Sequence, residues 1–295
     1  MKKIIIIGST GFLGISLTRF LKEKGFEVVS LSRKRNKHAH RNLIWNATEI
    51  GSWIDEMENA YAWINLAGRS VDCRYTEKNK SQILNSRVDS TRVLNEALEQ
   101  IITKPQVFLN SSTATIYDHS ENRPNTEADG IIGDDFSMNV AKAWEKEFFS
   151  FQIPETRKVA MRTSIVLGNG GGAFPKLKQI TALGLGGKQG KGNQMVSWIH
   201  VKDFCRVVLF ILESELAGPV NVTAPNPLKN AVFAKTLSEV MNKSIAIPQP
   251  AWLLKLGAMI IGTETELLLK SRFVMPEKLQ KAGYEWEFET VRECF

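Results

Sequence analysis

Cysteine and histidine are scarce in this sequence, with three and four residues among 295. The cysteines, Cys73, Cys205 and Cys294, lie far apart and form no CxxC pair. This spacing argues against a disulfide framework and against a zinc site, and it is typical of a reducing compartment. We therefore expect a cytoplasmic protein without a metal site.

Long apolar runs are also missing. A transmembrane helix needs about 18 consecutive apolar residues, and the nearest candidate, 252–262, is short and carries Lys255. The first apolar run stops at Gly8, which makes it too short for an export signal. The sequence therefore predicts a soluble chain with no membrane partner.

Acidic residues are outnumbered by basic ones, which gives a formal net charge of +7. The positive charge is scattered, except for a cluster at residues 33–41. A net excess alone is weak support for a nucleic-acid partner, and we expect none. The content of 43% hydrophobic residues is that of an ordinary globular protein, and the length corresponds to about two domains.

Short β-like runs alternate with helix-like runs along the first half of the chain. Residues 4–7 form a continuous isoleucine run, typical of a strand buried on both faces of a parallel sheet. Alternation of this kind predicts an α/β fold, a Rossmann-like doubly wound parallel sheet. Further strands are expected at 26–32, 62–66, 107–110 and 159–167, and helices at 13–21, around 93–98 and at 138–149.

Glycine and proline change the character of the chain after residue 168. Glycine-rich stretches at 168–172 and 184–192 are typical of loops that line a cleft or connect surface elements. Beyond about residue 224 the chain is expected to be mainly helical, with prolines between the helices.

These changes predict two structural units. The first is a dinucleotide-binding Rossmann domain formed by residues 1–168 and about 198–224. The second is a smaller, mainly helical C-terminal lobe on the substrate side, formed by about 169–197 and 225–295.

A glycine-rich turn follows the first expected strand and opens the first expected helix. Glycine permits the tight turn, lets the backbone approach a pyrophosphate and lets the helix pack on the strand. The N-terminus of the helix then faces the phosphates, so the motif predicts a dinucleotide site. The residues expected at the cofactor are Gly8, Thr10, Gly11, Phe12, Leu13 and Gly14.

No acidic residue ends the second expected strand, where NAD sites usually hold the ribose hydroxyls with Asp or Glu. Ser32 and Arg33 stand there instead. A guanidinium can grip a 2′-phosphate through two hydrogen bonds, so these residues favour NADP over NAD. The alternative is a basic loop that contacts only solvent.

Several blocks, together with the glycine-rich turn, resemble the extended short-chain dehydrogenase/reductase superfamily. They are Asn-Leu-Ala-Gly at 65–68, Ser-Ser-Thr-Ala-Thr-Ile-Tyr at 111–117, Arg-Thr-Ser-Ile-Val-Leu-Gly at 162–168 and Trp-Ile-His-Val-Lys-Asp at 198–203. The chain resembles more narrowly the atypical proteins of the NAD-dependent epimerase/dehydratase family. That likeness rests on blocks at 86–87, 144–145, 197–200, 224–227, 266–268 and 274–276.

The resemblance covers nearly the whole chain and implies the superfamily's chemistry. It implies cofactor contacts by Leu66, Ala67 and Gly68. It also implies that the protein is an enzyme, either an oxidoreductase or an epimerase. An epimerase is a kind of isomerase.

The tyrosine of the superfamily's catalytic set is missing. In that set a Ser or Thr holds the substrate oxygen, a Tyr about 25 residues later is the acid/base, and a Lys four residues further binds the nicotinamide ribose. Counting from Thr113 reaches Met138 and then Lys142. A thioether cannot exchange a proton, so the resemblance leaves roles for Thr113 and Lys142 but none for an acid.

Tyr117 is the candidate substitute. It is one of only four tyrosines and lies four residues past Thr113, where this fold's substrate pocket is expected. We therefore take Thr113, Tyr117 and Lys142 as candidate catalytic residues, with water as another proton route. The alternative is that Tyr117 is a strand-end aromatic residue that only packs against its neighbours or contacts the ligand. The other nearby titratable residues, expected as solvated loop residues, are Asp118, His119 and Glu127.

Two further features indicate structural contacts. Arg162 lies in an otherwise apolar strand, where an unpaired charge is costly, so we expect an acidic partner or, alternatively, a ligand phosphate. The helix at 141–149 carries Trp144, Phe148 and Phe149. Such helices form dimer interfaces in this fold, so a homodimer is expected by analogy.

The sequence therefore predicts an NADP-binding oxidoreductase or epimerase acting on a hydroxyl or carbonyl of a small molecule. A nucleotide-linked substrate is one option. The alternative is a non-catalytic NADP-binding sensor or regulatory protein, which the methionine at position 138 favours. The glycine-rich turn supports cofactor binding in both cases and does not discriminate between them.

Overall fold

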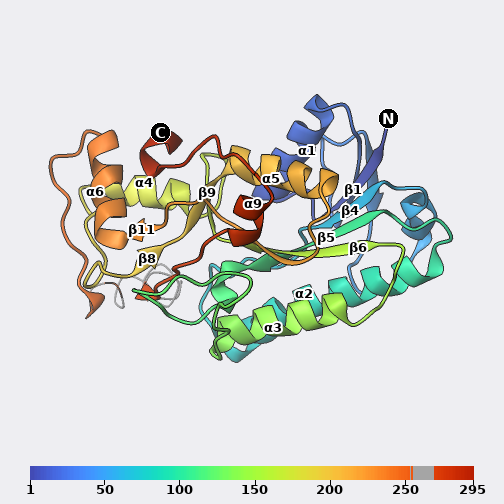
Figure 1. Ribbon diagram of the computed structural model, residues 1–295, viewed down its shortest axis with the longest axis horizontal. Coiled ribbons are helices and arrows are strands. Elements are labelled where there is room, and N and C mark those ends of the chain that lie inside the picture. Colours follow the sequence, from blue (N-terminus) through green and yellow to red (C-terminus); the bar gives the residue numbers. More distant parts are fainter. Residues whose placement is uncertain (253, 255–268) are drawn as a thin grey trace.

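Seven parallel strands form the central sheet of the molecule, in the order β10–β6–β5–β4–β1–β2–β3 (Figure 1). The computed structural model describes residues 1–252, 254 and 269–295. The block at 266–268 and most of the apolar run at 252–262 lie outside the described residues. The strands of the sheet are β1 (Lys3–Ile7), β2 (Glu27–Ser32), β3 (Arg41–Ile44), β4 (Ala62–Asn65), β5 (Val107–Thr113), β6 (Arg157–Thr163) and β10 (Gly218–Val222).

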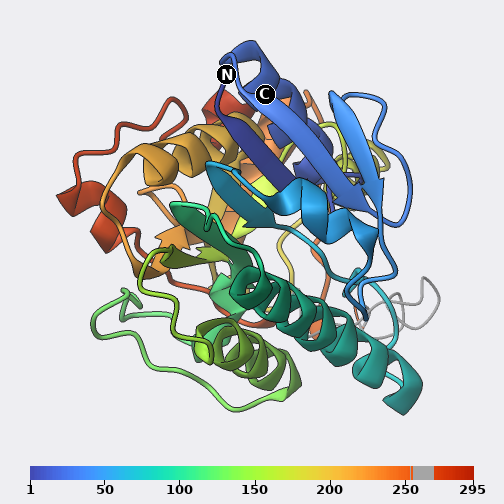
Figure 2. The same ribbon diagram turned by 90° about the vertical axis from the view of Figure 1, so that its right-hand side faces the viewer.

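Helices cover both faces of this sheet. Figures 1 and 2 show α1 (Phe12–Glu23) and α5 (Val201–Glu213) on one face, and α2 (Glu77–Gln100) and α3 (Phe136–Phe149) side by side on the other. Because side chains alternate along a strand, Ile4 and Ile6 enter the core beside α1 and α5, whereas Ile5 and Ile7 enter the core beside α2. The Rossmann-like doubly wound fold predicted from the sequence is confirmed.

The carboxyl ends of the central strands meet at one edge of the sheet. Ile7 of β1 pairs with Asn65 of β4, and Asn65 pairs with Asn110 of β5. The glycine-rich turn after β1 and the segment after β4 therefore leave the sheet side by side. In open parallel sheets this edge is where ligands bind.

The strand expected at 159–167 is in fact two strands, so that prediction is wrong. The chain leaves the main sheet at Ser164, after β6, and continues as β7 (Ile165–Leu167). β7 pairs with β9 (Trp198–His200) in a second, small sheet. An apolar run does not reveal which partner strand it will meet, so its periodicity could not separate the two.

The two edge strands of the main sheet carry weak sequence signals. β10 contains Gly218, Pro219 and Asn221, residue types that are depleted in strands, and proline is tolerated mainly at edges. β3 is short and none of its residues is fully buried. The sequence analysis predicted neither β3 nor β10.

A third core lies at the end of the molecule opposite the N-terminus, at the left of Figure 1. It joins Phe174, Phe233 and Leu237 to Trp198 and Val291. The elements around it are α4 (Phe174–Ala182), β8 (Met195–Val196), β11 (Leu228–Lys229), α6 (Asn230–Val240) and η3 (Val291–Cys294).

The chain then returns to the central sheet through α9 (Glu277–Lys281). Leu279 of this helix belongs to the core beside α1 and α5. Residues near the C-terminus are therefore shared between the two ends of the molecule. The division into two domains stays a prediction.

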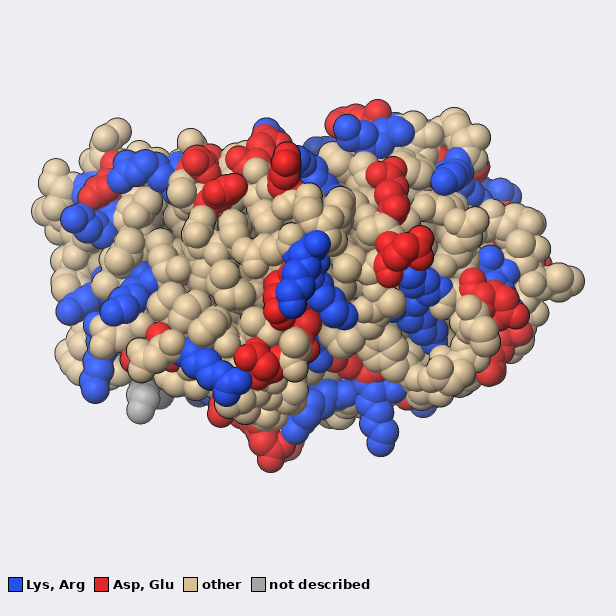
Figure 3. Space-filling view, viewed as in Figure 1, with Lys and Arg blue, Asp and Glu red and all other residues tan. Residues whose placement is uncertain are grey.

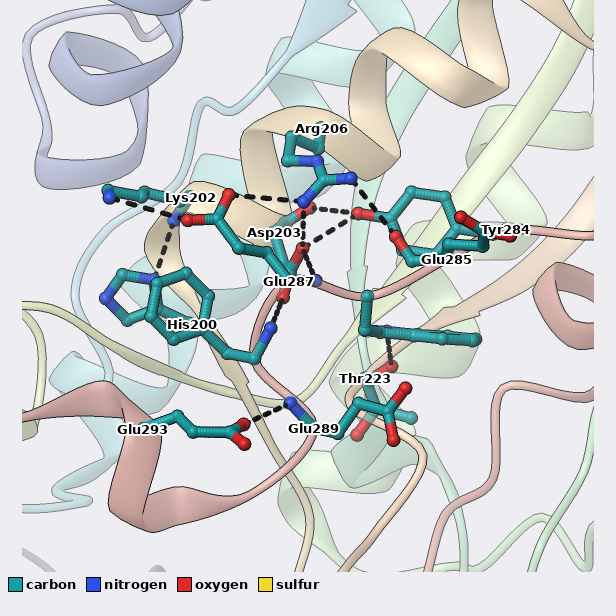
Figure 4. A network of polar contacts seen from close by, with 12 residues as sticks. His200, Lys202, Asp203, Arg206, Thr223, Tyr284, Glu285, Glu287, Glu289 and Glu293 are labelled. Carbon is teal, nitrogen blue, oxygen red and sulfur yellow. Dashed lines mark hydrogen bonds and ion pairs between the residues drawn. The ribbon is translucent and has the colours of Figure 1, made fainter.

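Asp203, in the first turn of α5, anchors the C-terminal segment (Figure 4). This fully buried carboxylate accepts hydrogen bonds from the backbone amides of Glu287 at 3.0 Å and Phe288 at 2.9 Å, and from the Tyr284 hydroxyl at 3.1 Å. His200 caps the same helix, and its ring lies against Phe288. Burial lowers the pKa of His200, so this histidine contributes as a neutral structural residue.

The outer surface carries both signs of charge. On the face shown in Figure 3, basic and acidic side chains are interspersed rather than gathered into one field of a single sign. Among the described helices, none combines the length and the apolar character that crossing a membrane requires.

Candidate cofactor and active site

The turn between β1 and α1 depends on glycine at two positions. Gly8 has φ of +74°, and a Cβ there would lie 2.7 Å from the Ala67 amide nitrogen. A Cβ on Gly14 would lie 2.5 Å from the Cα of Ser9. Gly8 thus permits the approach of the segment after β4, and Gly14 permits the helix to pack on the turn.

The first turn of α1 has no side chain capping its amide groups. Gly11 is the N-cap residue and supplies no capping side chain, and a Cβ on it would meet only the Gly8 carbonyl oxygen, at 3.9 Å. Amide groups at a helix N-terminus without a side-chain cap favour an anionic partner. The turn therefore fits the diphosphate of a dinucleotide. Phe12, the first residue of α1, packs beneath the glycine loop at 168–172.

The two residues expected at a 2′-phosphate differ in their surroundings. Ser32 is 2% exposed, and its hydroxyl accepts a hydrogen bond from the Ser9 amide at 3.0 Å. Arg33 is exposed and forms no ion pair with any described acidic residue. Asn36, which the sequence reasoning missed, donates to the Ser9 carbonyl at 3.0 Å and so ties the basic loop to the glycine turn.

A cavity of about 350 Å³ opens beside this turn, on the α2 and α3 side of the sheet. The segment after β4 contributes Ala67 and Gly68, and β5 contributes Ser111 and Thr113. Thr113, a predicted catalytic residue, therefore lines the cavity, as do three predicted cofactor residues, Leu66, Ala67 and Gly68. The cavity adjoins the glycine turn through the contact between Gly8 and Ala67.

The face of α3 that lines the cavity is not the expected one. Ser137 and Ala141, four residues apart, line the cavity, and Met138 and Lys142 do not. Met138 is buried at the start of the helix, where its sulfur accepts a weak hydrogen bond from the Asp135 amide at 3.4 Å. The count from Thr113 is therefore one residue too long: it reaches Met138, whereas Ser137 lines the cavity.

Lys142 lies at the surface. Its ammonium pairs with the exposed Asp134 carboxylate at 2.6 Å. The structure thus does not bring Lys142 together with Thr113 at the cavity.

Tyr117 belongs to a buried network behind the cavity. Its side chain is fully buried, and its hydroxyl donates to Asn221 Oδ1 at 2.9 Å and accepts from Arg162 Nη1 at 2.8 Å. Arg162 in turn forms two hydrogen bonds with Glu145, at 2.9 and 2.8 Å. Burial raises the pKa of Tyr117, which holds its proton more tightly.

This network shows what compensates the charge of Arg162, for which the sequence left an acidic partner or a ligand phosphate open. Of the two alternatives, the structure contains the acidic partner, Glu145, which also accepts from the Ser112 hydroxyl at 2.6 Å. Glu127 also has a partner within the chain, since its carboxylate accepts a hydrogen bond from the backbone amide of Asn221 at 2.8 Å. Burial raises the pKa of Glu127.

The aromatic residues that suggested a homodimer are largely occupied within the chain. Trp144 donates from its indole nitrogen to Thr91 Oγ1 of α2 at 2.9 Å, and Phe148 is fully buried against Phe108. These contacts account for the aromatic content of α3 without a second chain. The homodimer stays a prediction.

The sequence reasoning assigned no site role to three charged or phenolic cavity residues, Arg69, Tyr75 and Arg87. The Tyr75 hydroxyl lies 3.5 Å from the Ser137 hydroxyl, and its ring packs on Phe136. A signal existed for Arg87, because it lies four residues after the buried Ile83, on the inner side of α2. A loop tyrosine such as Tyr75 carries no comparable periodic signal.

Comparisons with known proteins place the chain among described relatives. The model of the NAD dependent epimerase/dehydratase family matches residues 4–133, and that of a domain of unknown function, DUF1731, matches residues 249–295. Epimerase family protein YfhF of Bacillus subtilis is 32% identical over 98% of this chain and 95% of its own length. Epimerase family protein SERP0438 of Staphylococcus epidermidis is 31% identical over 100% and 98%.

Solved structures agree with these relatives. Human epimerase family protein SDR39U1, crystallised with NADPH, superimposes with a TM-score of 0.87 at 29% identity, covering 99% of this chain and 97% of that one. A nucleoside-diphosphate sugar epimerase from Corynebacterium glutamicum gives 0.80 at 26% identity, covering 99% of this chain and 57% of its own. Since the fold, the glycine turn and the full-length relatives agree, the chain belongs to the NAD dependent epimerase/dehydratase family.

Proposed function

We propose that this protein is an NADPH-dependent oxidoreductase or epimerase acting on a carbonyl or hydroxyl of a small molecule held in the cavity. One observation carries the proposal. The cavity that the hydroxyl-bearing residues Thr113, Tyr75 and Ser137 line adjoins the glycine turn through Ala67. The reduced nicotinamide supplies a hydride when the cofactor is bound.

The preference for NADPH is supported by the end of β2. No carboxylate stands there to repel a 2′-phosphate, and the exposed Arg33 carries the charge that would hold it. The presence of NADPH in the human relative supports the same choice. The diphosphate would bind the amides of residues 8–14, and Leu66, Ala67 and Gly68 would contact the rest of the cofactor.

For the proton we propose Tyr75 in place of Tyr117. The hydroxyl of Tyr117 is enclosed by Arg162 and Asn221, whereas Tyr75 lines the cavity with Thr113. Thr113 would orient the substrate oxygen by a hydrogen bond. When a carbonyl carbon receives the hydride, its oxygen takes the proton from the Tyr75 hydroxyl, and solvent restores that proton.

Arg87 would take the place of the missing lysine. Its positive charge interacts favourably with an ionised Tyr75 across the cavity. Such a charge stabilises the phenolate that proton transfer leaves behind. Lys142 is paired at the surface, so the cation would come from α2 rather than from α3.

Calorimetric titration of the cofactor-stripped protein with NADPH, NADP⁺ and NADH is the first test. We expect NADPH to bind much more tightly than NADH. Carbonyl compounds are then screened by loss of the nicotinamide absorbance, with Tyr75→Phe and Tyr117→Phe as matched variants. Turnover lost in Tyr75→Phe and retained in Tyr117→Phe supports the proposed acid, whereas the reverse restores Tyr117.

A second function, a non-catalytic NADP-binding sensor, is favoured by one observation. None of the described α3 residues that line the cavity carries a phenol or an ammonium; they are Phe136, Ser137, Val140, Ala141 and Trp144. NADPH binding together with no turnover of any carbonyl or hydroxyl compound would support this function. Absence of binding by all three nucleotides would overturn both.

A further inference from the structure

Two arginines line the cavity, and none of the described residues in its lining is acidic. Arg69 comes from the segment after β4, and Arg87 comes from α2. We propose that this cavity is an anion site, and that the small molecule it holds is an organic acid whose carboxylate or phosphate is bound by Arg87 and Arg69. The inference rests on the proposed function and names the class of its substrate.

The guanidinium of Arg87 is set inside the fold. Its carbon lies 5.1 Å from the centre of the Trp144 ring, and a Cβ on Gly68 would lie 3.4 Å from it. One nitrogen donates to the Ile83 carbonyl at 2.9 Å. Trp144 is itself held by a hydrogen bond to Thr91, so the guanidinium lies between an oriented ring and the Gly68 backbone.

No described acidic residue forms an ion pair with Arg87. Its burial disfavours the charged form and lowers the pKa of Arg87 to about 10. A cation taken out of water without a partner is costly, and an anion entering the cavity would compensate it. A guanidinium also offers two parallel N–H donors, the geometry that a carboxylate or phosphate accepts.

Arg69 is held in place without being neutralised. Its guanidinium donates to Asn79 Oδ1 at 2.9 Å and to Gln82 Oε1, both uncharged amide oxygens. Its backbone amide donates to the Ser86 hydroxyl at 3.0 Å. The side chain is therefore oriented by α2 while its full positive charge remains available to a ligand.

The site is separate from the place expected for the cofactor's own phosphates. None of residues 8–14 lines the cavity, and the segment carrying Ala67 and Gly68 lies between the two. A volume of about 350 Å³ suits a small ligand. Hydroxyls at the strand end, from Ser111 and Thr113, would meet the carbonyl or hydroxyl of a ligand whose acid group faces the arginines.

The test measures binding rather than activity. The protein is saturated with NADP⁺, so that no reduction occurs, and titrated calorimetrically with matched acid and neutral probes. Carboxylates are represented by pyruvate and phenylpyruvate against their amides, and phosphates by dihydroxyacetone phosphate against dihydroxyacetone. We expect at least one acid to bind about tenfold more tightly than its neutral partner.

Variants assign the difference to the arginines. Arg87→Met should abolish the preference for the acid, Arg69→Met should reduce it, and Arg87→Lys should retain part of it because the charge remains. Arg92→Met is the matched control, since Arg92 is an exposed arginine on the same helix, paired with Asp89. Arg69→Met and Arg92→Met should bind NADPH as the unmodified protein does.

The outcomes separate the two proposals. If NADPH binds but no acid exceeds its neutral partner, or if Arg87→Met keeps the preference, the anion site is wrong and the proposed function stands. If NADPH itself does not bind, the proposed function fails. Carboxylate and phosphate probes identify which of the two acid groups the site prefers.

Discussion

Consecutive residues of α3 each contact an arginine inside the fold, and the two arginines have opposite surroundings. Glu145 forms a two-point ion pair with Arg162, which also donates to Tyr117. Trp144 offers Arg87 only the face of its ring. One cation is neutralised within the chain, and the other faces a cavity without a described acidic partner.

The difference separates structural groups from ligand-binding groups. A polar network that satisfies its own members leaves nothing for a ligand to compensate, so it contributes stability and a fixed geometry. The same contrast recurs at the end of β2. The Ser32 hydroxyl accepts a hydrogen bond from the Ser9 amide, whereas Arg33 is exposed. Substitutions at Arg162, Arg33, Tyr117 and Lys142, each with its own measurement, test this difference.

The largest effect is expected from breaking the neutralised pair. Arg162→Met should lower the free energy of unfolding by about 3–5 kcal/mol, because Glu145 remains as a buried charge without its partner. Arg87→Met leaves no orphaned charge, and its effect should be less than about 1 kcal/mol or stabilising. Urea denaturation measures both, and equal losses would remove the distinction.

The next effect concerns the basic loop. Arg33→Ala should weaken NADPH binding by about ten- to a hundredfold and leave NADH unchanged, since only NADPH presents a 2′-phosphate to the guanidinium. Ser32→Ala is the control. It removes the acceptor of the Ser9 amide and should weaken both nucleotides alike. Equal losses of both nucleotides in Arg33→Ala would discard the 2′-phosphate role.

A smaller effect is expected at Tyr117. Tyr117→Phe should reduce the free energy of unfolding by about 1 kcal/mol through the lost hydrogen bonds. Because burial raises the pKa of Tyr117, the native state keeps its proton above about pH 10, where the unfolded chain releases it. Stability is therefore lost as pH rises past that value.

The phenylalanine variant should lose less stability over this alkaline range than the unmodified protein. Denaturation curves recorded at several alkaline pH values measure the slope. Tyr75→Phe, at the cavity, is the matched comparison. A slope unchanged by Tyr117→Phe would contradict a network that holds the Tyr117 proton.

The smallest effect is expected at Lys142. Because its pair with Asp134 is exposed, Lys142→Ala should change the free energy of unfolding by no more than about 0.5 kcal/mol. It should also leave NADPH affinity unchanged in calorimetry. A large loss of NADPH affinity would instead restore the ribose contact that the sequence assigned to Lys142.

Most of the central fold could be predicted because its signals are local. The isoleucine run of β1 and the glycine turn after it depend on residues adjacent in sequence. The edge strands could not be predicted for the opposite reason. The conformation of β10 depends on its pairing with β6 rather than on its own residue types. The break at Ser164 likewise depends on β9, a partner about thirty residues away.

The site was predictable only in part. Thr113 and the segment 66–68 follow strands, and strand ends meet at one edge of the sheet, so their convergence follows from topology. The face of α3 could not be fixed by counting, because a shift of one residue rotates a side chain by about 100° around a helix. Ser137 and Ala141 therefore occupy the positions that the count gave to Met138 and Lys142.

The doubly wound sheet, the glycine turn and the lack of an acid after β2 could be predicted from the sequence, because each depends on residues that are neighbours in the chain. Which charges are compensated follows instead from the way the elements pack. Arg162 and Glu145 are 17 residues apart, and Tyr117 lies 45 residues before Arg162. Whether a buried charge meets its partner depends on which elements pack together, and that pairing left Arg162 neutralised and Arg87 facing the cavity.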